Sequence, residues 1–176
     1  MIGIGIIGAG GIALANHIPG FALCPDTKVV ALCDASKEAL ERAKAQTGIS
    51  NLYTDYNELL KRDDVSAVVI ATPNHLHAPI ALAAIGRGKH VVCEKPIAMD
   101  FAESLTMLQA AQRANIRHMI VFTYRFVPAM RYMAHLVHSG TIGQPYHFRA
   151  QQRGQDMELC LRVMFANFPK RRNQMQ

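Results

Sequence analysis

The chain opens with Ile2-Gly3-Ile4-Gly5-Ile6-Ile7-Gly8-Ala9-Gly10-Gly11-Ile12-Ala13, an apolar run that passes into a glycine-rich turn. The isoleucines predict a buried strand, and a helix is expected after the turn. Gly8, Gly10 and Ala13 have the spacing in which one glycine allows a tight turn, the next lets the backbone approach a pyrophosphate, and a small residue lets helix pack on strand. The helix start then offers N–H donors to phosphate oxygens. The stretch therefore predicts a dinucleotide site that includes Gly8, Ala9, Gly10, Gly11 and Ile12.

An acidic residue stands where such a site needs one. The run Lys28–Cys33 predicts a second strand, and Asp34 follows it, 21 positions after Ala13. Its carboxylate is expected to accept hydrogen bonds from both ribose hydroxyls and to repel a 2′-phosphate, which favours NAD. Ser36 or Lys37 could reach a phosphate, so NADP stays open. At this point S-adenosylmethionine enzymes, which use a similar turn and acid, and a turn without any ligand remain alternatives.

Strand and helix signals alternate along the chain. Apolar runs at residues 66–71, 89–93 and 118–122 predict further strands, with helical patterns between them. Near-continuous apolar strands are typical of a parallel sheet that is covered on both faces. We therefore expect an α/β fold, a Rossmann-type doubly wound parallel sheet with helices on both faces.

Polar residues mark the expected helix starts. Ser36 is expected to cap a helix that stops at Gly48. Asp55 with Glu58, and Asp100 with Glu103, have the spacing of capping boxes. A further helix is expected to begin at Pro128 and to end at Gly140.

The pattern changes near residue 145. Tyr146, Phe148 and Ala150 alternate with polar residues, as in a strand of an antiparallel sheet that has one solvent-facing side. We expect residues 1–124 to form an NAD(P)-binding domain. Residues 125–176 are expected to hold a linker helix and the first strand of an incomplete second α+β domain.

Composition and charge argue against several protein classes. The net charge of +6 is dispersed, so nucleic-acid binding is not expected. No Lys or Arg precedes Lys28, unlike a signal peptide, and no apolar stretch approaches the ~20 residues of a membrane span. The four cysteines lack CxxC spacing and fit the reduced thiols of a cytoplasmic protein. His75 and His77 lie two apart on a helix and point away from each other, so no metal site is expected.

Two later strands end in polar residues on the same predicted edge of the sheet. Ala71-Thr72-Pro73-Asn74 follows one strand, and Glu94-Lys95-Pro96 follows the next. Open α/β sheets bind ligands at this edge. Lys95 is the candidate catalytic residue, because an amine there can donate to a substrate hydroxyl or carbonyl.

These motifs together resemble the glucose-fructose oxidoreductase / inositol dehydrogenase / MocA (Gfo/Idh/MocA) family of NAD(P)-dependent oxidoreductases. The matching segments span about residues 2–153, and they are IGIIGAGGIA, ALCDAS, VVIATPNHLHAPIALAAIGRGKHVVCEKPIA, FTYRFVPA and SGTIGQPYHF. The resemblance implies a Rossmann domain that binds NAD(P) and a second α+β domain that covers the substrate. It also implies hydride transfer between the nicotinamide and a hydroxyl-bearing carbon of a sugar or cyclitol, and a homo-oligomer in full-length relatives.

The resemblance also assigns roles to residues. It implies that Lys95 contacts the substrate oxygen and the nicotinamide region, and that Pro96 is cis. The residues that it implies around the cofactor are Ala71, Thr72, Pro73, Asn74, His77, Glu94, Lys95 and Pro96, with Arg125 beside the active site. Ser36 joins them as a cofactor-binding candidate because it lies near Asp34.

The chain departs from the family pattern in two places. Thr123 stands where the family often has Asn, and residues 155–176 lack the family's later glycine cluster with its Asp and His. We therefore expect a truncated chain that binds cofactor with little turnover. The alternative is a non-catalytic dinucleotide-binding or interaction module.

Overall fold

The structure is a computed structural model that describes residues 1–149 and 164–165. It divides into two compact units, Met1–Phe122 and Thr123–Gln176, and each unit is described by itself. The elements of the first unit are β1 (Ile2–Ile7), a π-helical turn η1 (Ala13–His17), α1 (Ile18–Ala22), β2 (Thr27–Cys33), α2 (Lys37–Thr47), β3 (Leu52–Tyr53), α3 (Tyr56–Leu60), β4 (Ala67–Ile70), a 3₁₀ turn η2 (Asn74–Leu76), α4 (His77–Gly86), β5 (His90–Cys93), α5 (Phe101–Arg113) and β6 (His118–Ile120).

Six parallel strands form one sheet in the order β3-β2-β1-β4-β5-β6. This is the strand order of a doubly wound dinucleotide-binding sheet, so the predicted Rossmann-type α/β fold is confirmed. The chain moves outward from β1 to β3 and then returns to the other side of β1 at β4. A topological switch point therefore lies between β1 and β4, where such sheets bind their ligands.

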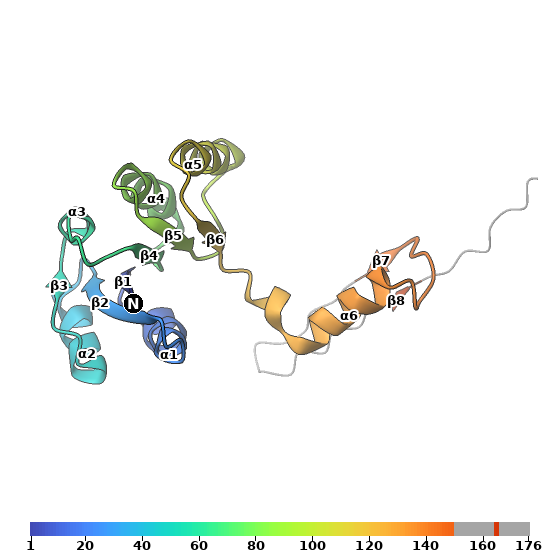
Figure 1. The fold of residues 1–176 in the computed structure, drawn as a ribbon, viewed down its shortest axis with the longest axis horizontal. Helices are drawn as coiled ribbons and strands as arrows, with labels where there is room; N and C mark the ends of the chain where they lie inside the picture. The colour runs from blue at the N-terminus through green and yellow to red at the C-terminus, as the bar shows by residue number, and fades with distance from the viewer. Residues whose placement is uncertain (150–163, 166–176) are drawn as a thin grey trace, which may run out of the picture. The chain divides into compact units, whose positions relative to one another are not determined.

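Helices cover both faces of the sheet, with α1 and α2 on one side and α3, α4 and α5 on the other (Figure 1). Successive strand residues such as Ile6 and Ile7 point to opposite faces and enter two separate cores. The core under α1 and α2 includes Ile4, Leu32, Leu40 and Val69. The core under α3, α4 and α5 includes Leu59, Val68, Ile80, Val91 and Met107. Burial on both faces explains why the strands read as continuous apolar runs.

The predicted cap residues all accept hydrogen bonds at their helix starts, but neither predicted capping box forms as expected. The Ser36 hydroxyl accepts a hydrogen bond from the Ala39 N–H at 3.2 Å, and α2 ends at Gly48. The capping box predicted at Asp55 is wrong in its second half. Asp55 accepts from the Asn57 N–H, but the Glu58 carboxylate pairs with Lys61, the residue that follows α3.

The box predicted at the start of α5 is present in a shifted form. Asp100 accepts from the Glu103 N–H at 2.8 Å, as expected. The Glu103 carboxylate in turn accepts from the Met99 N–H at 3.0 Å, one residue before the cap. The box therefore satisfies a donor just outside the helix rather than that of the cap residue itself.

An apolar pocket of about 270 Å³ opens on the first unit beside α4, α5 and β6. Its lining includes Leu105, Leu108 and Met119, all of which are partly exposed. The lining of the pocket is mostly apolar, which suits an apolar group better than a phosphate or a ribose.

The second unit contains η3 (Thr123–Phe126), α6 (Pro128–His138) and two short strands. β7 (Phe148–Arg149) pairs antiparallel with β8 (Met164–Phe165), in line with the antiparallel character expected near residue 145. The strand begins at Phe148, so Tyr146 of the expected alternation lies before it. Ala150 lies outside the described residues.

Candidate functional site

Four segments meet the same edge of the sheet because the strands that deliver them are parallel. They are the glycine turn after β1, Asp34 after β2, residues 71–74 after β4, and residues 94–96 after β5. Backbone hydrogen bonds join the first three where their strands end: the Gly8 N–H donates to Cys33 O at 2.8 Å, and the Ala71 N–H donates to Ile7 O at 2.8 Å.

The glycine turn has two glycines with different constraints. Gly8 has a φ of 101°, and a Cβ there would overlap the carbonyl of Ala71, so only glycine fits between the ends of β1 and β4. A Cβ on Gly10 would meet nothing within 4 Å. The backbone at Gly10 therefore faces open space, as the approach of a pyrophosphate requires.

Asp34 is tied to the glycine turn. Its Oδ2 accepts a hydrogen bond from the Ala9 N–H at 2.8 Å, and its Oδ1 accepts from the Ser36 N–H at 2.9 Å. Each carboxylate oxygen keeps a further lone pair, so a ribose hydroxyl can still donate to it. The contact with Ala9 was not predicted, since residues 25 apart in the sequence give no local signal.

At this edge of the sheet, the Thr72 hydroxyl is buried without a hydrogen-bond partner in the described part of the chain. Among the described residues, its Oγ1 is the one buried side-chain nitrogen or oxygen without a hydrogen-bond partner. Buried hydroxyls normally have a partner. A dinucleotide that lies on the open turn at Gly10 would meet a donor-and-acceptor hydroxyl here, so the residues present fit the expected cofactor.

His77 does not line this edge as the sequence suggested. The residue is fully buried at the start of α4. Its Nε2 lies 2.9 Å from Thr72 O and its Nδ1 lies 2.8 Å from Pro96 O. The ring thus joins the loop after β4 to the turn after β5. Because it is enclosed, any effect on a bound cofactor would act through those two loops.

The turn after β5 presents Lys95 to solvent. The Lys95–Pro96 peptide bond is cis, as the resemblance implied. The Lys95 N–H donates to Glu94 Oε2 at 3.1 Å, and Glu94 Oε1 lies 3.0 Å from His17 Nε2. Glu94 is buried, with 9% of its surface exposed, whereas Lys95 is exposed to solvent. The Glu94 side chain therefore stabilises the turn from the protein interior.

Sequence reasoning missed His17. It lies at the end of η1, where the Ile18 N–H bonds to Ala13 O in the wider π-helical pattern. Single π-helical turns are often found at functional sites. Its partner Glu94 is 77 residues away in the sequence, so no local pattern could have connected them.

Cys33 and Cys93, the two buried cysteines at the strand ends, are expected to be unreactive. Burial raises the pKa of Cys93 to about 12, helped by the charge of Glu94. Burial, followed by the charges of Asp34 and Asp55, raises the pKa of Cys33 to about 12. Both thiols therefore stay protonated near neutral pH, and neither is a candidate nucleophile.

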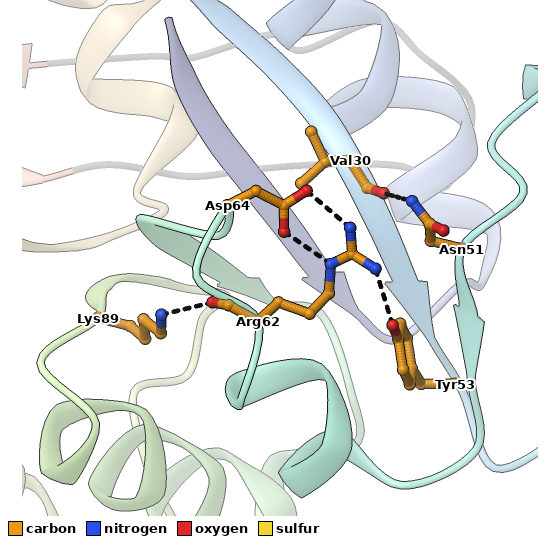
Figure 2. A network of polar contacts seen from close by, with 6 residues as sticks. All are labelled: Val30, Asn51, Tyr53, Arg62, Asp64 and Lys89. Carbon is orange, nitrogen blue, oxygen red and sulfur yellow. Dashed lines mark hydrogen bonds and ion pairs between the residues drawn. The ribbon is translucent and has the colours of Figure 1, made fainter.

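The polar network in Figure 2 joins β2 and the β3 segment to the segments that lead into β4 and β5. Arg62 donates to both oxygens of Asp64 and to the Tyr53 hydroxyl, and Lys89 donates to Arg62 O at 2.8 Å. The bonds from Arg62 hold the pKa of Asp64 below its usual value. Asn51 adds a bond to Val30 O. The network connects loops, and it reaches the candidate site at Tyr53, whose carbonyl oxygen accepts from the Asp34 N–H at 3.1 Å.

Arg125 lies in η3, in the second unit, and is exposed. Its assignment to the cofactor site therefore stays a prediction. Within residues 1–149 and 164–165, no group of three or more His, Cys, Asp or Glu side chains could hold a metal ion. Of the helices in the described part of the chain, none has the length and apolar character needed to cross a membrane.

Comparison with known proteins agrees with the fold. The family model described as "Oxidoreductase family, NAD-binding Rossmann fold", that of the Gfo/Idh/MocA proteins, matches residues 2–122. Levoglucosan dehydrogenase from Pseudarthrobacter phenanthrenivorans is 36% identical over 157 residues, which cover 84% of this chain and 40% of that protein.

Solved structures give the same result. An NAD-binding oxidoreductase from Klebsiella pneumoniae has a TM-score of 0.77 and 37% identity, over 85% of this chain and 42% of that one. Scyllo-inositol dehydrogenase from Lactobacillus casei, solved with NAD(H) and scyllo-inositol, has a TM-score of 0.79 and 29% identity, over 85% of this chain and 44% of that one. The chain therefore spans less than half the length of these relatives.

Proposed function

This chain belongs to the Gfo/Idh/MocA family of oxidoreductases with an NAD-binding Rossmann fold, and from this premise we propose that it binds NAD(H) along the edge formed by the glycine turn, Asp34 and Lys95. The observation that carries the proposal is the bond from Ala9 to Asp34 beside an open Gly10. It brings the phosphate-binding backbone and the ribose-binding acid together at the topological switch point.

The geometry favours NAD over NADP. The Asp34 carboxylate stands at the end of β2 and already accepts two backbone hydrogen bonds. A charged acid in this position would accept from ribose hydroxyls and repel a 2′-phosphate. Ser36 and Lys37 are exposed next to it, so NADP binding at lower affinity is also expected.

In the proposed reaction this chain contributes the Lys95 amine as a general acid or base. The nicotinamide, when bound, supplies a hydride acceptor or donor. Lys95 stands exposed at the carboxyl end of β5, where its Nζ can donate to a substrate carbonyl or accept the proton of a substrate hydroxyl. The Glu94 side chain and the Pro96 carbonyl anchor the turn, and only the lysine is free to reach the substrate.

The substrate class that we propose is a sugar or a cyclitol. The support is the naming of the relatives as levoglucosan and scyllo-inositol dehydrogenases. The match covers 40% of the first and 44% of the second. We therefore propose that the 176-residue polypeptide, assayed alone, binds cofactor with little turnover.

NADH fluorescence tests both parts of the proposal. Titration of the chain should give a saturable enhancement, with weaker saturation by NADPH. No saturable binding at millimolar NADH would refute the proposed site. Incubation with NAD and a panel of sugars and cyclitols should give little NADH, and brisk sugar-dependent reduction would refute the low turnover. Saturable binding without turnover, persisting in a chain extended to the length of the relatives, would favour a non-catalytic dinucleotide-binding module.

A further inference from the structure

Two histidines, the half-buried His17 and the fully buried His77, hold the residues on either side of Lys95. His17 contacts the Glu94 side chain, which in turn accepts the Lys95 N–H. His77 contacts the carbonyl oxygen of Pro96. The lysine is thus bracketed by one anchored neighbour before it and one after it, while its own side chain is exposed.

We propose that His17 and His77 are positioning residues that together fix the backbone of the Lys95 turn and so fix where the amine stands at the edge. Neither histidine touches the space above Gly10. That this positioning serves catalysis rests on the proposed function. That the two rings fix the backbone of the turn does not depend on it.

The direction of each contact follows from the partners. An ionised carboxylate and a carbonyl oxygen only accept hydrogen bonds, so each ring must donate. His17 must donate from Nε2 to Glu94, at 3.0 Å with 11% of each side chain exposed. His77 faces carbonyls from both nitrogens, and a neutral ring can donate to only one of them. If the turn is to be held, the Nδ1 donor toward Pro96 is the one that matters.

The two rings hold the turn from different parts of the fold. His17 comes from η1, directly after the glycine turn, and His77 begins α4, directly after residues 71–74. Each histidine therefore links the Lys95 turn to one of the other segments of the candidate site. A shift of either segment, as on cofactor binding, would be transmitted to the lysine.

Amide isosteres separate this role from a merely structural one. The side-chain nitrogen of Asn takes the place of histidine Nδ1, and that of Gln takes the place of Nε2. His77→Asn should keep the bond to Pro96, and His77→Gln should lose it. The order reverses at the other site, where His17→Gln should keep the bond to Glu94 and His17→Asn should lose it. If the two histidines only filled space, Asn and Gln would not differ in opposite directions at the two positions.

The readout is hydrogen exchange of the Lys95 amide, measured by NMR without any ligand. Loss of one hydrogen bond corresponds to roughly five- to tenfold in an equilibrium, so His77→Gln and His17→Asn should speed exchange by about that factor. His77→Asn and His17→Gln should stay within about twofold of the unsubstituted chain. His90→Asn and His90→Gln are matched controls, because His90 lies at the other end of β5, where its Nδ1 accepts from the Arg117 N–H. Neither control should change Lys95 exchange.

Equal exchange in Asn and Gln variants at each site, or the same acceleration in the His90 controls, would overturn the proposal. If the buried His77 variants fail to fold by circular dichroism, the His17 pair decides by the same criterion. A second readout is the protection of the Lys95 amine from acetic anhydride by NADH. Protection should be retained in His77→Asn and His17→Gln and reduced in His77→Gln and His17→Asn. Absence of that protection in the unsubstituted chain would count against the proposed function alone, since the exchange experiment needs no cofactor.

Discussion

The Asp34 carboxylate accepts a hydrogen bond from the Ala9 N–H at 2.8 Å, which joins the acid after β2 to the turn after β1. The same carboxylate accepts from the Ser36 N–H at the start of α2. One side chain therefore connects the glycine turn to the start of α2 and places a negative charge beside the turn. This double role leads to the first prediction.

Asp34→Asn should change cofactor preference. Removal of the charge relieves repulsion of a 2′-phosphate, so the ratio of NADPH to NADH affinity should rise about tenfold, equivalent to ~1.4 kcal/mol. An amide can accept from only one of the two backbone donors, so stability should fall by about 1 kcal/mol. Asp64→Asn is the control, since it removes a carboxylate toward the opposite edge and should leave the ratio unchanged. Equal ratios in Asp34→Asn and the unsubstituted chain would argue against Asp34 as the ribose partner.

Two glycines of the same turn should respond differently to alanine. Gly8→Ala forces a side chain into a positive φ and against the Ala71 carbonyl, and should cost about 2–3 kcal/mol of unfolding free energy. Gly10→Ala adds a methyl group to open space, so its stability should stay within ~0.5 kcal/mol. Its NADH affinity should nevertheless fall roughly tenfold, because the methyl group enters the space that we assign to the pyrophosphate. Urea denaturation and NADH titration measure the two effects, and unchanged NADH binding in Gly10→Ala would place the cofactor elsewhere.

Lys95 should be shielded by bound NADH. Labelling with acetic anhydride and peptide mapping should show several-fold slower modification of Lys95 when NADH is saturating, because its amine stands beside the proposed nicotinamide position. Lys61, which is exposed and paired with Glu58 on α3, should be labelled at the same rate with and without NADH. Equal labelling of Lys95 under both conditions would contradict the proposed orientation of the cofactor.

The buried thiols should resist alkylation. The pKa values of Cys33 and Cys93 are about 12, so the reactive thiolate is scarce in the folded chain at pH 8, whereas Cys24 is exposed. A raised thiol pKa also favours the folded state below pH ~9, and this contribution is lost as pH rises toward 12. Iodoacetamide at pH 8 should therefore modify Cys24 long before the other two. Modification of Cys93 as fast as Cys24 would mean that β5 opens readily.

The elements with local causes were predictable from the sequence. Apolar runs located β1, β2, β4 and β5, and hydroxyl or carboxylate caps located the starts of α2 and α5, because these signals act between close neighbours. The failed box at Asp55 is also local: Glu58 had a nearer partner in Lys61. β3 was missed because Leu52–Tyr53 is too short to show a period.

The edge itself was predictable, but its internal contacts were not. Because the strands are parallel, their carboxyl ends bring Gly8, Asp34, Thr72 and Lys95 to one edge of the sheet, independently of the loop conformations. The contacts of His17 with Glu94 and of His77 with Pro96 depend on the packing of helices across 77 and 19 residues of sequence. No local pattern in the sequence indicates these contacts, which make His77 a buried link between two loops.

Chemical-shift mapping with ¹⁵N-labelled protein tests most directly whether a pyridine dinucleotide lies along this edge. Titration with NADH should give saturable shifts at the amides of Gly10, Ser36, Thr72 and Lys95, which lie on four separate segments. Shifts that gather instead at Leu108 and Met119, beside the apolar pocket, or no saturable shifts at millimolar NADH, would contradict the account.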